Sequence, residues 1–435
     1  MAKRICVIGT GYVGLVTGAS LADFGNQVVC VDIDSSKIRM LNEGRLPIFE
    51  PGLAELVEKN SREGRLSFST GIGTAVETCE GVFLGVGTPT TTNGGADLSF
   101  LKQALAEVAT HLVGPKVIVT KSTVPVGTNR WIKKFLHSQD PSADIQVVSN
   151  PEFLREGKAV HDVFHPDRVV IGAETSKAQE FMKDIYKALY LIETPFLFCN
   201  FETAELIKYA SNAFLATKIT FINQMANLCE SLGADVHQLA KGMGMDGRIS
   251  SKFLHPGPGF GGSCFPKDTK ALVQIGESCG EVPTLVREVI LANQRQKERM
   301  VSKMEEFFQG TLVGKKVAIL GLAFKAGTDD IRESPALGII RGLLKRGANV
   351  MAHDPQAMEN AKSEFGSAVA FAGNEYSALD GADALVILTE WNQYRSLDLE
   401  VAKKRMKGNF ILDTRNVLDV EQARRLGFFY KGVGR

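Results

Sequence analysis

The stretch KRICVIGTGYVG, residues 3–14, decides the expected fold of this chain. Its first half is a short apolar run rich in β-branched residues, which is typical of a strand buried on both faces of a sheet. Three glycines at Gly9, Gly11 and Gly14 follow, and the next residues form an apolar stretch of helical character that ends at Gly25. The order strand, tight turn, helix predicts the first unit of a parallel α/β sheet.

Strand-like runs recur along the first half of the chain and then begin again after residue 311. In the first half they lie at 26–34, 81–89, 116–125 and 144–153, and helical stretches alternate with them. In the second half KKVAILGLAFKAG (315–327) repeats the opening stretch, and three further runs repeat the later strands at 347–355, 382–393 and 409–417. The second half therefore predicts another, modified sheet domain. Its glycine loop is degraded, because Leu322 and Lys325 stand where small residues would be wanted.

Between the two halves, residues 200–233 predict one long helix from 201 to 232 with Asn200 as its N-cap. A helix of this length spans about 48 Å at about 1.5 Å per residue, enough to join two domains and to pack against a copy of itself. We expect an α/β protein with two Rossmann-like parallel-sheet domains joined by a long central helix. The expected domains are 1–200, 201–310 and 311–435, and the expected assembly is a homodimer or a higher homo-oligomer.

Composition excludes several classes of protein. The 435 residues carry 50 basic and 49 acidic side chains, intermixed, so no basic patch for nucleic acid is visible. No apolar run is long enough to cross a membrane, and the N-terminus does not read as a signal peptide. The seven cysteines are scattered and contain no C-x-x-C pair, which argues against a disulfide scaffold and against structural zinc. We expect a cytoplasmic enzyme without a metal ion.

The glycine turn predicts a dinucleotide site. Gly9 permits the sharp turn, Gly11 lets the backbone approach a pyrophosphate, and Gly14 allows close packing of helix on strand. Asp32 ends the next strand, 18 residues after Gly14, where a carboxylate accepts bonds from ribose hydroxyls and repels a 2′-phosphate. NAD is therefore expected rather than NADP. The alternative is a structural glycine turn with a surface aspartate.

Two loops at the ends of later strands contain threonine and proline, at Thr88-Pro89 and at 122–125. Ligands of open parallel sheets bind beyond those strand ends, so both loops are candidates for the same crevice. The alternative is that threonine and proline only form turns there.

Cys264 lies in GFGGSCFPKD, residues 259–268, a glycine-rich loop with neither helical nor strand periodicity. A lone cysteine is most often a buried, inert side chain. A metal site would need a second cysteine or a spaced histidine, and His255 alone does not supply one. Lys267 and Asp268 stand close by, and a neighbouring lysine favours the nucleophilic thiolate. Together with a nicotinamide cofactor, such a thiol suggests oxidation of an aldehyde through a thiohemiacetal and a thioester, which water hydrolyses to an acid.

The chain resembles the UDP-glucose/GDP-mannose dehydrogenase family over nearly its whole length. The resemblance is carried, in order, by GTGYVG, IFEPGL (48–53), GVGTPT, STVPVGT, NPEFLREG (150–157), KYASNAFLATKI (208–219), GFGGSCFPKD and FKAGTDDIRESPA (324–336). It implies a two-step, four-electron, NAD-dependent oxidation of a sugar-nucleotide alcohol to a carboxylate, with no free aldehyde released. UDP-glucose is the expected substrate and UDP-glucuronate the expected product. GDP-mannose and a UDP-N-acetylhexosamine are the alternatives within the family.

The resemblance also implies catalytic roles. Cys264 would be the nucleophile. Lys208 and Asn212 are four residues apart, so they share one helix face and can both point into a cleft between domains. Lys208 would stabilise the oxyanion at C6, and Asn212 would hold that oxyanion or the sugar by hydrogen bonds.

Three further residues would handle the water that hydrolyses the thioester. Asp268 would orient or deprotonate it together with Thr123, and Glu152 would hold it as a general base. The cofactor would be bound by Gly9, Gly11, Tyr12, Val13, Gly14, Asp32, Lys37, Thr88, Thr123, Glu156, Lys267 and Arg332.

The sugar nucleotide would contact the segment 152–156, the cysteine loop and the C-terminal domain, which would bind UDP. The expected substrate residues are Glu152, Phe153, Leu154, Arg155, Lys208, Asn212, Arg248, Phe253, Gly257, Gly261, Phe265, Phe324, Lys325 and Arg415. Arg248 would reach a site on the partner subunit of a dimer.

Two alternatives of other classes stay open. One is a two-electron alcohol dehydrogenase in which Cys264 takes no part. The other is a non-catalytic NAD-binding or redox-sensing module, which explains the first domain but not the set Lys208, Asn212, Cys264 and Asp268.

Overall fold

The computed structural model describes residues 2–435, which form two compact units. The N-terminal unit extends to Ser211 and includes Glu277–Cys279, and the C-terminal unit comprises Asn212–Gly276 and Gly280–Arg435. Most of the central segment therefore groups with the C-terminal sheet. The finer division into three domains at 200/201 and 310/311 stays a prediction.

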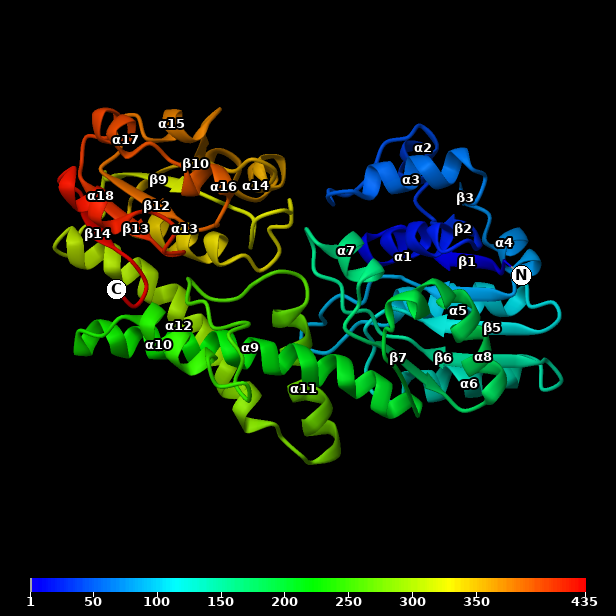
Figure 1. Cartoon of the computed structure of the whole chain (residues 1–435). Helices are drawn as coiled ribbons and strands as arrows, with labels where there is room; N and C mark the ends of the chain where they lie inside the picture. The colour runs from blue at the N-terminus through cyan, green and yellow to red at the C-terminus, as the bar shows by residue number, and fades with distance from the viewer. Residues whose placement is uncertain (1) are drawn as a thin grey trace. The chain divides into compact units, whose positions relative to one another are not determined.

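The N-terminal unit is built on one eight-stranded sheet in the order β3-β2-β1-β4-β5-β6-β7-β8 (Figure 1). The first six strands in this order have the doubly wound arrangement of dinucleotide-binding domains and are all parallel. Strand β7 then pairs antiparallel with β6, which extends the sheet beyond the parallel part. The strands are β1 Arg4–Ile8, β2 Gln27–Val31, β3 Leu66–Ser69, β4 Gly81–Leu84, β5 Lys116–Thr120, β6 Ile145–Ser149, β7 Val169–Ala173 and β8 Phe196–Cys199.

Helices lie on both faces of this sheet, and each face is covered by its own apolar cluster. This explains why strands such as β1 are apolar at nearly every position and do not alternate. The helices of this unit are α1 Tyr12–Asp23, α2 Ser35–Asn42, α3 Leu53–Arg62, α4 Ile72–Thr78, α5 Ser99–Thr110, α6 Thr128–Gln139, α7 Ala159–Phe164 and α8 Ser176–Ile185, with a 3₁₀ helix η1 at Lys187–Ile192.

The C-terminal unit contains a six-stranded, wholly parallel sheet in the order β11-β10-β9-β12-β13-β14. This is the same winding as the first six strands of the N-terminal sheet, so the expected sheet repeat is confirmed. Its strands are β9 Lys316–Leu320, β10 Asn349–His353, β11 Ala370–Phe371, β12 Ala384–Ile387, β13 Phe410–Asp413 and β14 Phe429–Lys431. Its helices are α13 Pro335–Lys345, α14 Met358–Phe365, α15 Glu375–Ala378, α16 Asn392–Arg395, α17 Leu399–Arg405 and α18 Val420–Arg425, with a 3₁₀ helix η2 at Gly366–Ala368.

The first turn of the second sheet differs from that of the first sheet. Gly321 after β9 still adopts a positive φ of 103°, but α13 does not begin until Pro335. The intervening residues 322–334 form an irregular loop. The degraded glycine pattern in the sequence therefore corresponds to a loop that has replaced the tight strand-to-helix turn.

Four central helices complete the chain, and the longest is the predicted one. Helix α9 runs unbroken over Phe201–Leu232, and Asn200 caps it by accepting a 2.9 Å hydrogen bond from the Thr203 amide. The others are α10 Val236–Gly244, α11 Phe265–Cys279 and α12 Thr284–Phe307. Within residues 2–435, none of the helices combines the length and the hydropathy needed to cross a bilayer.

The turn between β1 and α1 is held by glycine packing. Gly9 has a φ of 99°, a region that favours glycine. A Cβ atom on Gly14 would come within 1.9 Å of the Gly9 carbonyl oxygen, whereas one on Gly11 would meet nothing within 4 Å. Gly14 is therefore required for packing, and Gly11 is not.

We expect Gly14→Ala to destabilise the protein by about 1–3 kcal/mol, because a backbone atom must move to admit the methyl group. Thermal unfolding followed by circular dichroism measures this effect. Gly11→Ala is the matched control and should unfold at the wild-type temperature. Equal stability of the two variants would contradict the packing argument.

Candidate functional site

The glycine turn and Asp32 form one connected structure at the start of α1. Asp32 Oδ2 accepts 2.8 Å hydrogen bonds from both the amide and the hydroxyl of Thr10, and its Oδ1 accepts one from the Asp34 amide at 3.0 Å. Partial burial by itself would raise the pKa of Asp32, but these hydrogen bonds hold it below its usual value. The carboxylate therefore stays ionised beside the turn.

The turn fits a dinucleotide. The space around Gly11 is open in the direction that a side chain would take, and the N-terminal amides of α1 begin there. A helix N-terminus with free space in front of it is suited to a pyrophosphate. Gly9, Gly11, Val13, Gly14 and Asp32 thus lie in or beside this turn, and their binding of a cofactor stays a prediction.

Tyr12, also in the turn, has a partner that the sequence did not indicate. Its hydroxyl donates to the buried carboxylate of Glu50, which also accepts bonds from the amides of Gly157 at 2.6 Å and Ala159 at 2.7 Å. Tyr12 and Glu50 therefore tie the nucleotide turn to the end of the NPEFLREG segment. The signal for Glu50 was present in IFEPGL, but nothing in the sequence revealed its partner.

The two Thr-Pro loops meet at the ends of β4 and β5. Thr88 donates a 2.9 Å hydrogen bond from its hydroxyl to the carbonyl of Thr123. Lys37, also predicted for the cofactor, lies on α2 with its ammonium 4.0 Å from Asp34. The bond between Thr88 and Thr123 joins the two loops to one another.

Glu152 and Lys208 form a buried ion pair in the N-terminal unit. The ammonium lies 2.9 Å from Glu152 Oε1, and the two side chains are 4% and 5% exposed. The other oxygen of Glu152 accepts the Leu154 amide at 2.5 Å, and the Phe153 ring lies 5.4 Å from the ammonium. Burial alone would raise the pKa of Glu152, but the charge and hydrogen bond of Lys208 hold it below its usual value. An ionised carboxylate and an ammonium are thus placed together with little water around them.

Lys121 is a second lysine in this region, and the sequence reasoning missed it. Its ammonium donates to Asn150 Oδ1 at 3.1 Å and to the Tyr186 hydroxyl at 3.3 Å. Burial lowers the pKa of Lys121 to about 8, with Glu152 opposing the shift and Lys208 adding to it. Its only sequence signal was its position directly before STVPVGT.

In the C-terminal unit, Cys264 immediately precedes the first residue of α11 and is partly exposed. Its carbonyl accepts the Asp268 amide at 2.8 Å, and its sulfur lies 3.6 Å from the Ser263 hydroxyl. A helix N-terminus favours negative charge on groups that lie beside it. By contrast, Cys30 is fully buried, and burial raises the pKa of its thiol to about 12.

Asp268 links the cysteine loop to α9. Its fully buried carboxylate accepts hydrogen bonds from Asn212 Nδ2 at 2.6 Å and from Lys267 Nζ at 2.5 Å. The ammonium of Lys267 is thus directed at Asp268. Since Lys208 and Asn212 are one turn apart on α9, that helix carries one member of each cluster, the ion pair with Glu152 and the bond to Asp268.

Several predicted substrate residues gather near the cysteine loop within the C-terminal unit. A Cβ atom on Gly257 would lie 3.4 Å from Arg415 Nη1, and one on Gly262 would lie 2.7 Å from the Phe324 ring. Arg415 donates to the Phe324 carbonyl at 2.9 Å. A Cβ atom on Gly261 would lie 2.3 Å from the Glu333 carbonyl oxygen, so the loop must be glycine where it passes residues 324–334.

Other predicted residues are engaged with local partners. Arg155 pairs with Asp162, and Arg332 pairs with Asp330 at 2.7 Å. The Arg248 side chain is 90% exposed and pairs with Asp246. The Lys325 ammonium lies 5.2 Å from the Phe324 ring, and the Phe253 and Phe265 rings lie 6.3 Å apart. The roles of these residues toward ligands stay predictions.

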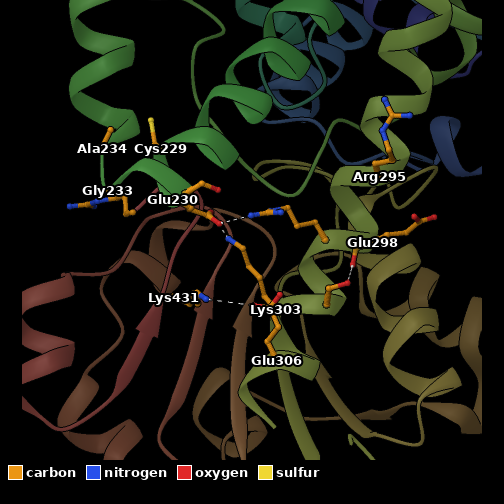
Figure 2. A pocket seen from close by; sticks show the side chains of 13 residues that line it. Cys229, Glu230, Gly233, Ala234, Arg295, Glu298, Lys303, Glu306 and Lys431 are labelled. Atoms are coloured by element: carbon orange, nitrogen blue, oxygen red, sulfur yellow. Dashed lines mark hydrogen bonds and ion pairs between the residues drawn. The ribbon is translucent and has the colours of Figure 1, made fainter. Parts of the chain in front are cut away.

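A cavity of about 630 Å³ in the C-terminal unit contains none of the predicted site residues (Figure 2). It lies against the ends of α9 and α12 and the C-terminal residues, and Glu230 and Lys303 point toward one another in it at 2.5 Å. Glu230 also pairs with Arg299 at 3.1 Å, so this one carboxylate contacts two of the basic side chains that line the cavity. Nowhere in residues 2–435 do three or more potential metal-binding side chains come together.

Three successive segments of the chain match domain models of one protein family. Residues 3–190 match the NAD binding domain of the UDP-glucose/GDP-mannose dehydrogenase family, residues 202–295 its central domain and residues 318–420 its UDP binding domain. A UDP-glucose 6-dehydrogenase of Rhizobium meliloti strain 1021 is 48% identical over 435 residues, with 99% of each chain covered.

Solved structures agree. A UDP-glucose dehydrogenase of the archaeon Pyrobaculum islandicum superimposes with a TM-score of 0.93 at 39% identity, covering 100% of this chain and 98% of that one. A UDP-D-ManNAc dehydrogenase of Pyrococcus horikoshii gives a TM-score of 0.87 at 27% identity, with 99% of each chain covered. With the glycine turn, the matched domains and these relatives taken together, the chain belongs to the UDP-glucose/GDP-mannose dehydrogenase family and is an NAD-dependent oxidoreductase.

Proposed function

We propose that the protein oxidises the C6 alcohol of UDP-glucose to the carboxylate of UDP-glucuronate in two successive steps, with a covalent intermediate on Cys264. The observation that carries the proposal is the arrangement of Cys264 at the head of α11, tied through Asp268 to Asn212 on α9. Full-length identity of 48% to a protein named UDP-glucose 6-dehydrogenase supports the choice of sugar.

The first oxidation removes a hydride from C6 and a proton from its hydroxyl, and leaves an aldehyde. Bound NAD supplies the hydride acceptor in each of the two oxidations. Lys208 stabilises the negative charge that develops on the C6 oxygen, and its buried pairing with Glu152 keeps the ammonium in place without help from water. Asn212 donates to Asp268 and is available through its carbonyl to the sugar.

The second oxidation passes through the thiol. The Cys264 sulfur bonds to C6 of the aldehyde, whose oxygen gains a proton, and a thiohemiacetal results. Loss of the second hydride from C6, with the proton from its oxygen, leaves a thioester. Water then adds to C6, the C–S bond breaks, and the thiol and the carboxylate are released. Overall, one alcohol, one water and two oxidised cofactors yield one carboxylate, two reduced cofactors and three protons.

Glu152 and Asp268 have different proposed roles toward the water that hydrolyses the thioester. The pKa of Glu152 lies below its usual value, which makes the carboxylate a weak base at neutral pH. We therefore propose that Glu152 holds Lys208 and accepts a hydrogen bond from water. Asp268 and Thr123 orient the water, as the sequence reasoning proposed.

The remaining residues are proposed as binding groups. Gly257, Gly261, Phe324, Lys325 and Arg415 would hold the UDP moiety, and residues 152–155 the sugar and phosphates. Phe253 and Phe265 would pack beside the substrate, and Arg248 would act on the partner subunit. Glu156, Lys267 and Arg332 would contact NAD. A mechanism that depends on a reduced thiol also favours a reducing, cytoplasmic location.

A panel of nucleotide sugars tests the substrate. With UDP-glucose, we expect about two NADH formed per sugar consumed, because the alcohol loses four electrons. NADH absorbance and chromatography of the sugar measure this ratio. GDP-mannose, UDP-N-acetylglucosamine and UDP-N-acetylmannosamine should react at least about a hundredfold more slowly by kcat/KM. A better rate with any of these would overturn the sugar assignment, and a ratio of one would overturn the four-electron course.

Cys264→Ala should lose the second oxidation by a factor of about a thousand or more, since the nucleophile is gone. Asp268→Asn, incubated with UDP-glucose and NAD, should accumulate a protein species heavier by the glucuronyl nucleotide, as measured by intact mass spectrometry. Cys279→Ala is the control, because it removes an exposed cysteine at the far end of the same helix. Wild-type acid production by Cys264→Ala would refute the covalent route.

We also propose a homodimer formed through α9. Its C-terminal part exposes large apolar side chains at intervals of seven residues, with Phe214 66%, Phe221 42% and Leu228 51% exposed. This spacing places them on one side of the helix, as in helices that pack along their length. A second copy of this chain is the partner that presents a matching stripe.

Phe221→Glu should shift the protein from dimer to monomer, because a charge would be buried in the apolar contact. Size-exclusion chromatography with light scattering measures the mass. Phe100→Glu is the matched control, since Phe100 is 49% exposed on α5 in the other unit. A wild-type protein that is monomeric at micromolar concentration would contradict the proposal directly.

A further inference from the structure

Three buried amide side chains surround the segment that leads to Cys264. Asn223 lies on α9, and Asn293 and Gln296 lie on α12. They are only 2%, 6% and 3% exposed. Polar side chains at this depth need hydrogen-bond partners, so their partners indicate what they are for.

The partners are backbone groups of the cysteine loop. Asn223 Oδ1 accepts the Gly257 amide at 2.8 Å, and Gln296 Nε2 donates to the Gly257 carbonyl at 2.9 Å. Asn293 Oδ1 accepts the Phe260 amide at 2.8 Å, and its Nδ2 donates to the Phe260 carbonyl at 3.0 Å. The backbone amide and carbonyl of Gly257 and of Phe260, three residues apart, are thus all hydrogen-bonded. We call these three side chains the amide clamp.

The loop has no regular secondary structure of its own. Residues 254–264 contain neither helix nor strand, and Gly259 and Gly262 have φ angles of 116° and 83°. Glycine-rich backbone loses much conformational freedom when it is ordered. The amide clamp supplies the hydrogen bonds that a strand neighbour would supply in a sheet.

The clamp also fits the loop closely and is itself held. A Cβ atom on Gly259 would lie 2.8 Å from Asn293 Oδ1, so the loop can approach the clamp only as glycine. Asn227 donates to Gln296 Oε1 at 3.0 Å, which fixes the orientation of that amide. The clamp residues border a cavity of about 240 Å³ together with Arg295 and Arg299. Arg295 and Arg299 also line the larger cavity of about 630 Å³.

We propose that Asn223, Asn293 and Gln296 are positioning residues that set the place of the Cys264 sulfur for attack on the aldehyde. The inference rests on the proposed covalent function of Cys264. The clamp holds Phe260, which lies four residues before Cys264, and α11 begins immediately after Cys264. Release of the clamp frees the loop on one side of Cys264 only, so the helix remains while the sulfur loses its fixed position.

The expected consequence is specific to the second oxidation. The first oxidation proceeds without a bond to sulfur, whereas the second requires the sulfur to reach C6. A misplacement of about 1 Å costs about a hundredfold in rate. Loosening the clamp should therefore let the aldehyde escape before the thiol adds, which the intact enzyme would prevent.

Asn293→Ala removes both bonds to Phe260 and is the primary test. With UDP-glucose, we expect fewer than two NADH per sugar consumed, and aldehyde captured by hydroxylamine and identified by mass spectrometry. We also expect at least about a tenfold lower kcat for acid formation. Asn293→Asp keeps the acceptor for the Phe260 amide and should recover part of the ratio. Gln294→Ala, an exposed amide on the same helix, is the control and should behave as wild type.

Gln296→Leu is the second variant, which fills the same volume and removes the bond to Gly257. If Asn293→Ala does not fold, this variant tests the positioning role of the clamp instead. A ratio of two without trapped aldehyde, in a folded variant, would overturn the proposal. Equal loss of both oxidations together with a lowered melting temperature would reduce the clamp to a structural role and also overturn it. Failure of the covalent function itself is distinguishable, because Cys264→Ala would then still form acid at the wild-type rate.

Discussion

An α-helix repeats its direction about every 3.6 residues, and this repeat sets which side chains of α9 lie on the same side of the helix. Four buried polar side chains lie along one side of α9 at positions 205, 208, 212 and 223. Glu205 accepts the amides of Gly127 and Asn129 at the start of α6, and Lys208 pairs with Glu152. Asn212 holds Asp268, and Asn223 holds Gly257. A proline inside α9 would kink the helix and disturb the contacts of the side chains nearest to it.

Burial makes these contacts effective. A charge or an amide removed from water must be paired, and breaking a buried pair costs several kcal/mol, of order 3–5, because its partner is left behind. Glu152 and Lys208 satisfy this requirement with one another, and Asn293 and Gln296 of the amide clamp satisfy it with backbone groups of the loop. Lys208, Asn212 and Asp268 lie in helices, whereas Cys264 lies in the glycine-rich loop. The thiol can sit in a glycine-rich loop and still be reproducibly placed.

The two sheets share one strand order but belong to domains that bind different ligands. Both have the same winding through six strands, but the first retains a glycine turn that opens directly into α1. In the second, residues 322–334 replace that turn and carry Phe324, which meets Arg415 and the cysteine loop. The loss of the tight turn removes a pyrophosphate cradle and supplies a longer loop near Cys264. This agrees with the NAD binding and UDP binding domains matched by the two halves of the chain.

The sequence by itself determined the elements and their order. Local periodicity and glycine geometry act over short distances in the chain, so the sequence predicts the elements that depend on them. These are the apolar strands, the G-x-G-x-x-G turn with Asp32, the repeat after residue 311 and the span of α9. Family resemblance then named Cys264, Lys208, Asn212 and Asp268. Only the tertiary structure decided the partners: Tyr12 with Glu50, Lys121 with Asn150, and Asn293 with Phe260. These pairs join residues from 29 to 38 positions apart in the chain. A single side chain gives no periodic pattern in the sequence. The hydrogen-bond partner of a buried polar group is therefore known only from the folded structure.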